Sequence, residues 1–188
     1  KLGFIFQDFN LLDTLTAYEN IALALSIQKR SAKQIDRAVK EVAQQLGITD
    51  VLKKYPYQMS GGQKQRIAIA GILAMKPKCI IFDEPTAMLD PSGRKEVLDT
   101  IIDLNKNYGI TVILITHYMD EAAKADRIVV MDKGKLILDG KPRDVFSNVE
   151  KMKSIGLDVP QVTELSYELQ KAGINIDTRI LDVNEMVN

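Results

Sequence analysis

The spacing of apolar residues along the chain predicts strands that alternate with amphipathic helices. Leu2 to Phe6 is rich in β-forming residues and predicts a buried strand. The short apolar run Lys78 to Phe82 predicts a strand buried on both faces of a parallel sheet, and Thr111 to Thr116 predicts a second buried strand. Pro91 to Asn107 lies between them and is predicted to be the helical crossover that parallel neighbours need. This order of elements predicts an α/β fold with a parallel sheet core.

Three more helices are predicted between the first strand and the second. Apolar residues at helical spacing run through Thr14 to Lys29 and through Ser31 to Leu46, and Gly47 is suited to end the second of these helices. Ser60 is predicted to be the N-cap of a third helix, from about Gly61 to Met75. A helical region is therefore expected to be inserted between the first two strands.

The last third of the chain predicts a hairpin followed by short helices. Arg127 to Met131 and Lys135 to Asp139 are strand-like and are joined through a turn. Beyond Pro142 only short helical stretches are predicted, including Thr163 to Ala172. We therefore expect one main domain over residues 1–140, with a helical part at about 11–76, and an appended helical segment over residues 141–188.

Composition narrows the class of protein. The 25 basic and 25 acidic side chains among 188 residues cancel, so no nucleic-acid partner is expected. Cys79 is the only cysteine, which excludes an internal disulfide and fits a reducing compartment. The apolar runs are far shorter than the roughly 20 residues that span a membrane, so a soluble protein is expected. Because the chain starts at Lys1 directly on a strand-like run and without Met, we expect it to be N-terminally truncated.

The most specific pattern is Met59-Ser60-Gly61-Gly62-Gln63-Lys64-Gln65-Arg66. A serine cap followed by two glycines exposes backbone N–H groups at the start of a helix, where the peptide dipoles favour an anion. An ordinary capped helix is the alternative, but each glycine lowers helix stability by roughly 1 kcal/mol relative to alanine. The pattern therefore favours a phosphate ligand at this helix start.

Two adjacent carboxylates follow the second predicted strand. Asp83 and Glu84 stand at its carboxyl end, which is where open α/β sheets bind their ligands. One carboxylate can hold a metal ion while the other polarises a water molecule, as phosphoryl transfer requires. An Asp-Glu turn is common on protein surfaces, so the two carboxylates alone would only suggest a site. Their spacing from the glycine-led helix is what favours a functional role.

Three other polar residues are placed near strand or helix ends. Gln7 follows the first strand and by itself is an ordinary loop residue. Asp90 precedes Pro91 and is suited to cap the following helix. His117 is the only histidine and follows the strand that ends at Thr116, so we expect it at the same sheet edge as the two carboxylates, in contact with a terminal phosphate.

In their order and spacing, these patterns resemble the ATPases of ABC transporters, from Lys1 to about residue 140. Gln7 matches the Q-loop, Met59 to Arg66 the signature motif, Ile80 to Glu84 the Walker B motif, Asp90 the D-loop and His117 the switch histidine. The resemblance implies a P-loop NTPase-like sheet with a helical signature subdomain. It also implies ATP hydrolysis that drives a membrane transporter from the cytoplasmic face of the membrane.

The resemblance also implies a role for each matching residue. Asp83 would hold Mg²⁺ through water, Gln7 would sense the Mg²⁺ and the γ-phosphate, and Glu84 would be the general base. His117 would contact the γ-phosphate, and Asp90 would relay between two ATP sites. Family members pair head to tail, so the set that touches the ATP of a second ABC ATPase subunit would be Ser60, Gly61, Gly62 and Gln63.

The chain departs from the family in one motif. No stretch reads G-x-x-x-x-G-K-[ST], the phosphate-binding Walker A loop, which the family places before the Q-loop. We therefore expect a truncated form of the ATPase that hydrolyses almost no ATP by itself. The alternative is a non-catalytic module that completes the ATP site of a partner subunit. A soluble ABC ATPase acting on DNA or ribosomes is a further alternative, but the coiled-coil insertion or second cassette typical of that class is not seen.

The two ends of the chain resemble different members of the family. Phe4 to Leu12 resembles ATPases of lipoprotein-release and peptide-export systems. Asp139 to Phe146 and Gly156 to Leu165 resemble the energy-coupling-factor ATPases that serve vitamin or metal-ion uptake. A mosaic sequence is one hypothesis for this difference. The difference affects which transported substrate the resemblance implies, because the family docks its transmembrane subunits on the helical segment after the Q-loop.

Overall fold

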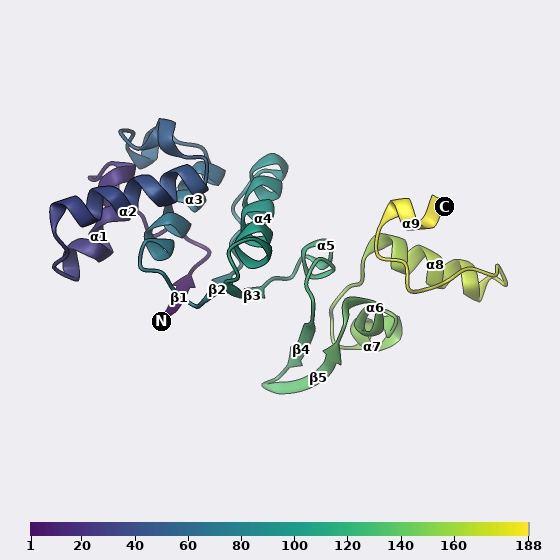
Figure 1. Ribbon diagram of the computed structural model, residues 1–188. Helices are drawn as coiled ribbons and strands as arrows, with labels where there is room; N and C mark the ends of the chain where they lie inside the picture. The colour runs from purple at the N-terminus through teal and green to yellow at the C-terminus, as the bar shows by residue number, and fades with distance from the viewer. Residues whose placement is uncertain (188) are drawn as a thin grey trace. The chain divides into compact units, whose positions relative to one another are not determined.

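The computed structural model describes residues 1–187 and divides the chain into two compact units (Figure 1). The first unit is Lys1–Ile115 and the second is Thr116–Asn188. The predicted hairpin lies in the second unit together with the residues beyond 140, and the predicted domain boundary near residue 140 stays a prediction. No helix in the described part of the chain combines the length and the apolar character that crossing a membrane requires.

The elements predicted for the first unit are confirmed, with ends that differ by at most three residues. In chain order they are β1 (Leu2–Ile5), α1 (Ala17–Ile27), α2 (Ala32–Gln45), α3 (Gly61–Leu73), β2 (Cys79–Asp83), α4 (Pro91–Lys106) and β3 (Thr111–Ile115). Short 3₁₀ turns lie at Thr49–Val51 and Pro56–Gln58. Thr16, Ser31 and Ser60 start α1, α2 and α3 with reciprocal capping boxes, which is why each helix begins where the sequence changes from turn to apolar spacing.

The three strands of the first unit form the predicted parallel sheet, with β2 in the middle. Leu2 is in register with Cys79, and Cys79 is in register with Thr111. Helix α4 is the crossover between β2 and β3, as predicted. Because all three strands run in the same direction, their carboxyl ends meet at one edge of the sheet.

One face of this sheet carries the core of the unit. Ile80 and Phe82 of β2 are fully buried there, in one cluster with apolar residues of all four helices. A Cβ atom on Gly3 would lie 2.3 Å from Ile72 of α3, so this helix rests directly on β1. The close approach needs a residue without a side chain at position 3.

The opposite face of the sheet is largely open in the described part of the chain. Its exposed apolar side chains are Leu2, Phe4, Ile113 and Ile115. The predictions of a strand buried on both faces and of a second buried strand are therefore wrong for the described residues. Continuous apolar runs are typical of strands with two-sided cover, but successive side chains of a strand alternate between faces, and only one face is covered here.

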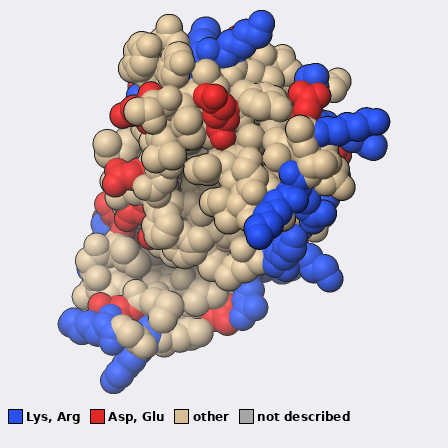
Figure 2. All heavy atoms as spheres, turned by 90° about the vertical axis from the view of Figure 1, so that its left-hand side faces the viewer, with Lys and Arg blue, Asp and Glu red and all other residues tan. Residues whose placement is uncertain are grey.

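A shallow apolar groove of about 170 Å³ lies beside the sheet, between the segment that follows β1 and the helices α1 and α3. Its lining includes Phe6, Phe9, Leu23 and Ile72. In the view from the side of α1, uncharged residues make up most of the visible surface, and acidic and basic side chains lie scattered among them (Figure 2). Both signs of charge occur on this face, in agreement with the zero net charge of the sequence.

The second unit consists of the predicted hairpin and several short helices. These are α5 (Met119–Ala122), β4 (Ile128–Asp132), β5 (Lys135–Gly140), α6 (Pro142–Phe146), α7 (Val149–Ser154), α8 (Gln161–Lys171) and α9 (Val183–Val187). The two strands pair antiparallel, as predicted, and Val130 of β4 is buried with Val145, Phe146 and Met152 of α6 and α7. Among the described residues, six form the buried centre of this small core.

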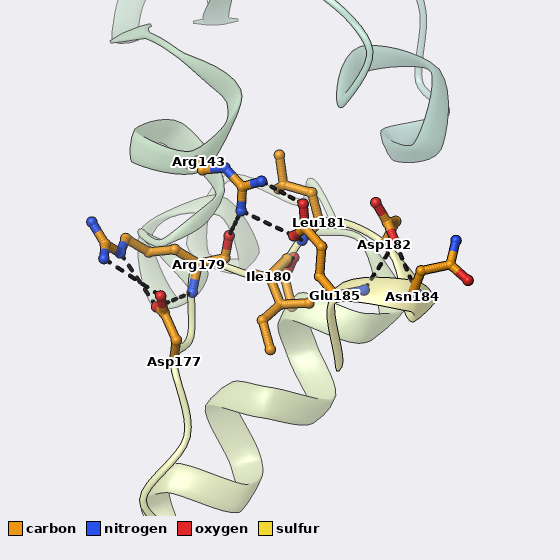
Figure 3. A network of polar contacts seen from close by, with 9 residues as sticks. Arg143, Asp177, Arg179, Ile180, Leu181, Asp182, Asn184 and Glu185 are labelled. Atoms are coloured by element: carbon orange, nitrogen blue, oxygen red, sulfur yellow. Dashed lines mark hydrogen bonds and ion pairs between the residues drawn. The ribbon is translucent and has the colours of Figure 1, made fainter. Parts of the chain in front are cut away.

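Polar contacts bind the end of the chain to α6 (Figure 3). The guanidinium group of Arg143 donates to the carbonyl oxygen of Arg179 at 2.8 Å and to Oε2 of Glu185 at 3.0 Å. The same Glu185 oxygen accepts from the backbone N–H of Leu181 at 3.0 Å. The exposed Arg143 side chain of α6 thereby binds the C-terminal segment at two places, Arg179 and Glu185.

Candidate functional site

The first part of the site is the signature turn, which we define as Ser60 to Gln63 at the start of α3. The Ser60 hydroxyl accepts from the Gln63 backbone N–H at 3.2 Å, and the Gln63 side chain accepts from the Ser60 N–H at 3.0 Å. In an α-helix the N–H groups of the first turn have no acceptor within the helix. The capping box satisfies Gln63, so the N–H groups of Gly61 and Gly62 are the donors that this turn offers to an anion.

The second part is the carboxylate pair at the end of β2. Asp83 is the last residue of the strand and is in register with Ile115 of β3. Glu84 follows with φ of +47°, a left-handed conformation that is uncommon for residues other than glycine. Its N–H donates to the Ile115 carbonyl at 2.9 Å, and its own carbonyl accepts from Ala87 at 3.2 Å. The strand thus ends in a fixed turn, and a strained backbone of this kind is a common feature of active sites.

Gln7 lies at the same edge of the sheet as the carboxylates. It is exposed and follows β1, whose last residue Ile5 is in register with Phe82 of β2. Because β1 and β2 are parallel, the residue after β1 and the residues after β2 leave the sheet on the same side. The structure therefore brings Gln7, Asp83 and Glu84 to one edge of the first unit.

Asp90 caps α4, as the sequence predicted. Its Oδ1 accepts from the Gly93 N–H at 3.3 Å, and Pro91 occupies the first helical position. The cap is compatible with a further role at an ATP site, because the Asp90 residue itself is exposed.

His117 lies two residues beyond β3 and belongs to the second unit. It is exposed, and its ring centroid is 4.2 Å from that of Tyr118. The placement of His117 beside the carboxylates stays a prediction, since it concerns residues of both units.

Sequence reasoning missed the residues that hold the signature turn in place. A Cβ atom on Gly62 would lie 3.2 Å from Cα of Gly93, so the first turns of α3 and α4 touch through their backbones. One turn further on, Arg66 donates to Glu96 at 2.9 Å. A glycine in the first turn of α4 was the one available signal, whereas a pair of charges 30 residues apart gives none.

Comparison with known proteins places the chain in one family. The ABC transporter family profile matches residues 1–87. The energy-coupling factor transporter ATP-binding protein EcfA1 of Clostridium perfringens is 58% identical over 190 residues, which cover 100% of this chain and 67% of that protein. EcfA2 of Caldanaerobacter subterraneus subsp. tengcongensis is 42% identical over 189 residues, which cover 98% of this chain and 66% of that protein. The chain thus spans about two thirds of the length of these relatives.

Relatives of the energy-coupling-factor class align along essentially the whole chain, including the part before residue 12. The comparisons therefore give no separate support to a mosaic sequence, because one class of relatives covers both ends of the chain.

Two solved structures share the fold. The cbiO1 protein of Clostridium perfringens, described as part of the ABC transporter complex cbiONQ, superposes with a TM-score of 0.73 at 32% identity, over 90% of this chain and 67% of that one. The ATP-binding cassette MJ0796, a dimer bound to ADP and phosphate, gives 0.65 at 34% identity, over 76% of this chain and 63% of that one. The chain therefore belongs to the ATP-binding subunits of ABC transporters, the ATPases that couple ATP hydrolysis to transport across a membrane.

Proposed function

We propose that this chain forms the signature and Walker B parts of the ATP sites in an energy-coupling-factor type ABC transporter. The observation that carries the proposal is the pairing of two features in one unit, namely a glycine-led, capped helix start and a sheet edge that bears Gln7, Asp83 and Glu84. The first offers N–H donors to phosphate, and the second offers carboxylates to a metal ion and a water molecule. A relative that matches the whole chain is named a transporter ATP-binding protein, which supports the proposal.

Each residue then has one task in the mechanism. Glu84 accepts a proton from the attacking water, and its backbone turn holds the carboxylate at the end of β2. Gln7, at the end of β1, would sense the Mg²⁺ ion and the γ-phosphate, and His117 would donate a hydrogen bond to the terminal phosphate. The signature turn binds the phosphates of the ATP held by a second subunit, so each ATP site is complete only in a dimer.

Mg²⁺ is the metal that suits the donor set at this edge. Within the described residues, no group of three His, Cys, Asp or Glu side chains could hold a metal ion. Mg²⁺ commonly binds one or two carboxylates, with phosphates and water filling the remaining positions, and Asp83 and Gln7 supply oxygen atoms of that kind. When bound, the ion would neutralise the charge that develops on the phosphates.

The transmembrane subunits are proposed to dock in the apolar groove beside Phe9 and Leu23. This groove adjoins the segment that follows Gln7, so movement of the docked subunit reaches the ATP site along a short stretch of chain. Docking there would make the chain a peripheral subunit, and we propose that it lies on the cytoplasmic face of the membrane, as the resemblance to ABC transporter ATPases implies. Replacing Leu23 with Asp should release the subunit from detergent-solubilised transporter, whereas replacing exposed Lys33 of α2 with Asp should not.

The decisive experiment compares Glu84→Gln with Glu41→Gln in the assembled transporter. Glu41 is an exposed glutamate of α2 in the same unit, so the control removes the same charge away from the site. Loss of a general base lowers turnover by about 10²- to 10⁴-fold. Turnover that survives Glu84→Gln would contradict the proposal.

The second candidate is a non-catalytic module that completes a partner's ATP site. The observation in its favour is that residues 1–188 contain no G-x-x-x-x-G-K-[ST] sequence. Under both proposals the purified chain alone hydrolyses almost no ATP. In the assembled transporter they differ, because a non-catalytic module tolerates Glu84→Gln but does not tolerate damage to the signature turn.

A further inference from the structure

The signature turn is packed against the start of α4 with almost no space between the two backbones. A Cβ on Gly62 would lie 3.2 Å from Cα of Gly93, and a Cβ on Gly93 would lie 2.8 Å from Oδ1 of Asp90. Contacts this short leave no room for a side chain on either residue without movement of the backbone or of the cap. The pair of glycines thus sets the distance between the signature turn and the Asp90 cap.

A second contact, one turn further along each helix, fixes the direction of α3. Arg66 Nη2 lies 2.9 Å from Glu96 Oε2. The Arg66 side chain is 19% exposed and that of Glu96 is 50% exposed. The buried Arg66 Nε has no hydrogen-bond acceptor within the described residues, so the Glu96 carboxylate is the contact that orients this guanidinium group.

A third contact comes from the loops that carry the other site residues. A Cβ on Gly61 would lie 2.8 Å from Leu89, next to Asp90, and 3.7 Å from the ring of Phe9, two residues after Gln7. Lys64 also lies over the Phe9 ring, with Nζ 5.9 Å from the centroid. The start of α3 therefore touches both of the loops that leave the carboxylate edge.

We propose that Arg66 and Glu96 are positioning residues that lock the signature turn to the start of α4, so that the turn and the Asp90 loop move as one body. This inference rests on the proposed function, in which the signature turn serves the partner's ATP while Glu84 serves the ATP of its own subunit. Through this contact between Arg66 and Glu96, ATP binding or hydrolysis at one site would shift the other site, by way of the six residues between Glu84 and α4. It assigns cooperativity between the two sites to a contact within a single subunit.

Folding stability should depend little on this pair, because partly exposed ion pairs contribute little to it. Its loss should instead free the start of α3 to shift relative to Asp90. Turnover and cooperativity are therefore expected to change while the melting temperature stays nearly constant.

The kinetic test uses the assembled transporter with Arg66→Met, Glu96→Gln and the double charge reversal Arg66→Glu with Glu96→Arg. Asp99→Asn is the matched control, because Asp99 is an exposed acid three residues along the same helix. Each single variant should lower kcat about fivefold and bring the Hill coefficient for ATP toward one, within the range reported for residues that couple two sites. The charge reversal should restore most of both values.

A second readout does not depend on ATP hydrolysis. Hydrogen exchange at the Gln63 amide, which donates to Ser60, should be faster in Glu96→Gln than in Asp99→Asn. Equal exchange and equal kinetics in these two variants would overturn the inference, as would a charge reversal that restores nothing. Faster exchange in a transporter that hydrolyses no ATP would confirm the lock but contradict the proposed function, and with it the coupling of the two sites.

Discussion

The first unit is held by a buried core and close backbone contacts, whereas the second is held by a small core with charged pairs around it. In the first, Ile80 and Phe82 are fully buried, and the motif residues Gln7 and Ser60 are exposed. In the second, exposed charges such as Arg143 and Glu185 pair with one another (Figure 3). The comparison indicates that the larger core of the first unit carries exposed motif residues such as Gln7 and Ser60 at its surface, while the small core of the second unit is supplemented by ion pairs.

The largest effect on the free energy of unfolding is expected from a substitution in the core of the first unit. Phe82→Ala should lower the free energy of unfolding by about 3–5 kcal/mol, because it leaves a cavity beneath the helices. Ile115→Ala, on the open face of the sheet, should cost much less, since this side chain is already 47% exposed. Denaturant unfolding of both variants measures the difference. Equal losses would mean that the open face of the sheet is covered in the folded protein.

A smaller effect is expected at the signature turn. Ser60→Ala removes the side-chain cap of α3 and should lower the free energy of unfolding by about 1 kcal/mol. Thermal unfolding, compared with the same change at Ser31 of α2, measures this cost. Because both serines form the same capping box, similar costs would show that Ser60 is no more important to folding than an ordinary cap.

The smallest effect concerns the surface pairs of the second unit. Hydrogen bonds from Arg127 hold the pKa of the Asp139 carboxyl below its ordinary value. Since the folded pKa is the lower one, the stabilisation is present above the unfolded pKa of about 3.9 and is lost as pH falls through the folded value. An NMR titration of Asp139 should show its pKa rise in Arg127→Met. An unchanged titration would mean that the pair does not form in solution.

Local chemistry made most of the elements predictable. The residues that start α3 and α4 lie close together in the sequence, namely Ser60 with Gln63 and Asp90 with Pro91. The end of α2 was predictable in the same way, because Gly47 adopts the positive φ expected after a helix. The exposure of β1 and β3 could not be predicted, because it depends on what covers the sheet rather than on the strands themselves.

The site was predictable to a similar degree. The sequence pattern placed His117 beside Asp83 and Glu84, which stays a prediction. The parallel register of β1 and β2 puts Gln7 at the edge that bears these carboxylates, although the pattern alone indicated only a loop residue. The contacts between Gly62 and Gly93 and between Arg66 and Glu96 join helices distant in sequence, so no local pattern announces them.

The proposed function requires that the signature turn of this chain bind the phosphates of ATP held by another subunit. Ser60→Asp tests it most directly, because aspartate caps a helix as well as serine does but places a negative charge where the phosphate should bind. The measurement is ATP-dependent association of the chain with a subunit that carries a Walker A loop, followed by sedimentation. We expect the unmodified chain to associate only when ATP is present, and we expect the Ser60→Asp variant to keep its melting temperature but not to associate. Equal ATP-dependent association of both proteins would contradict the proposed function.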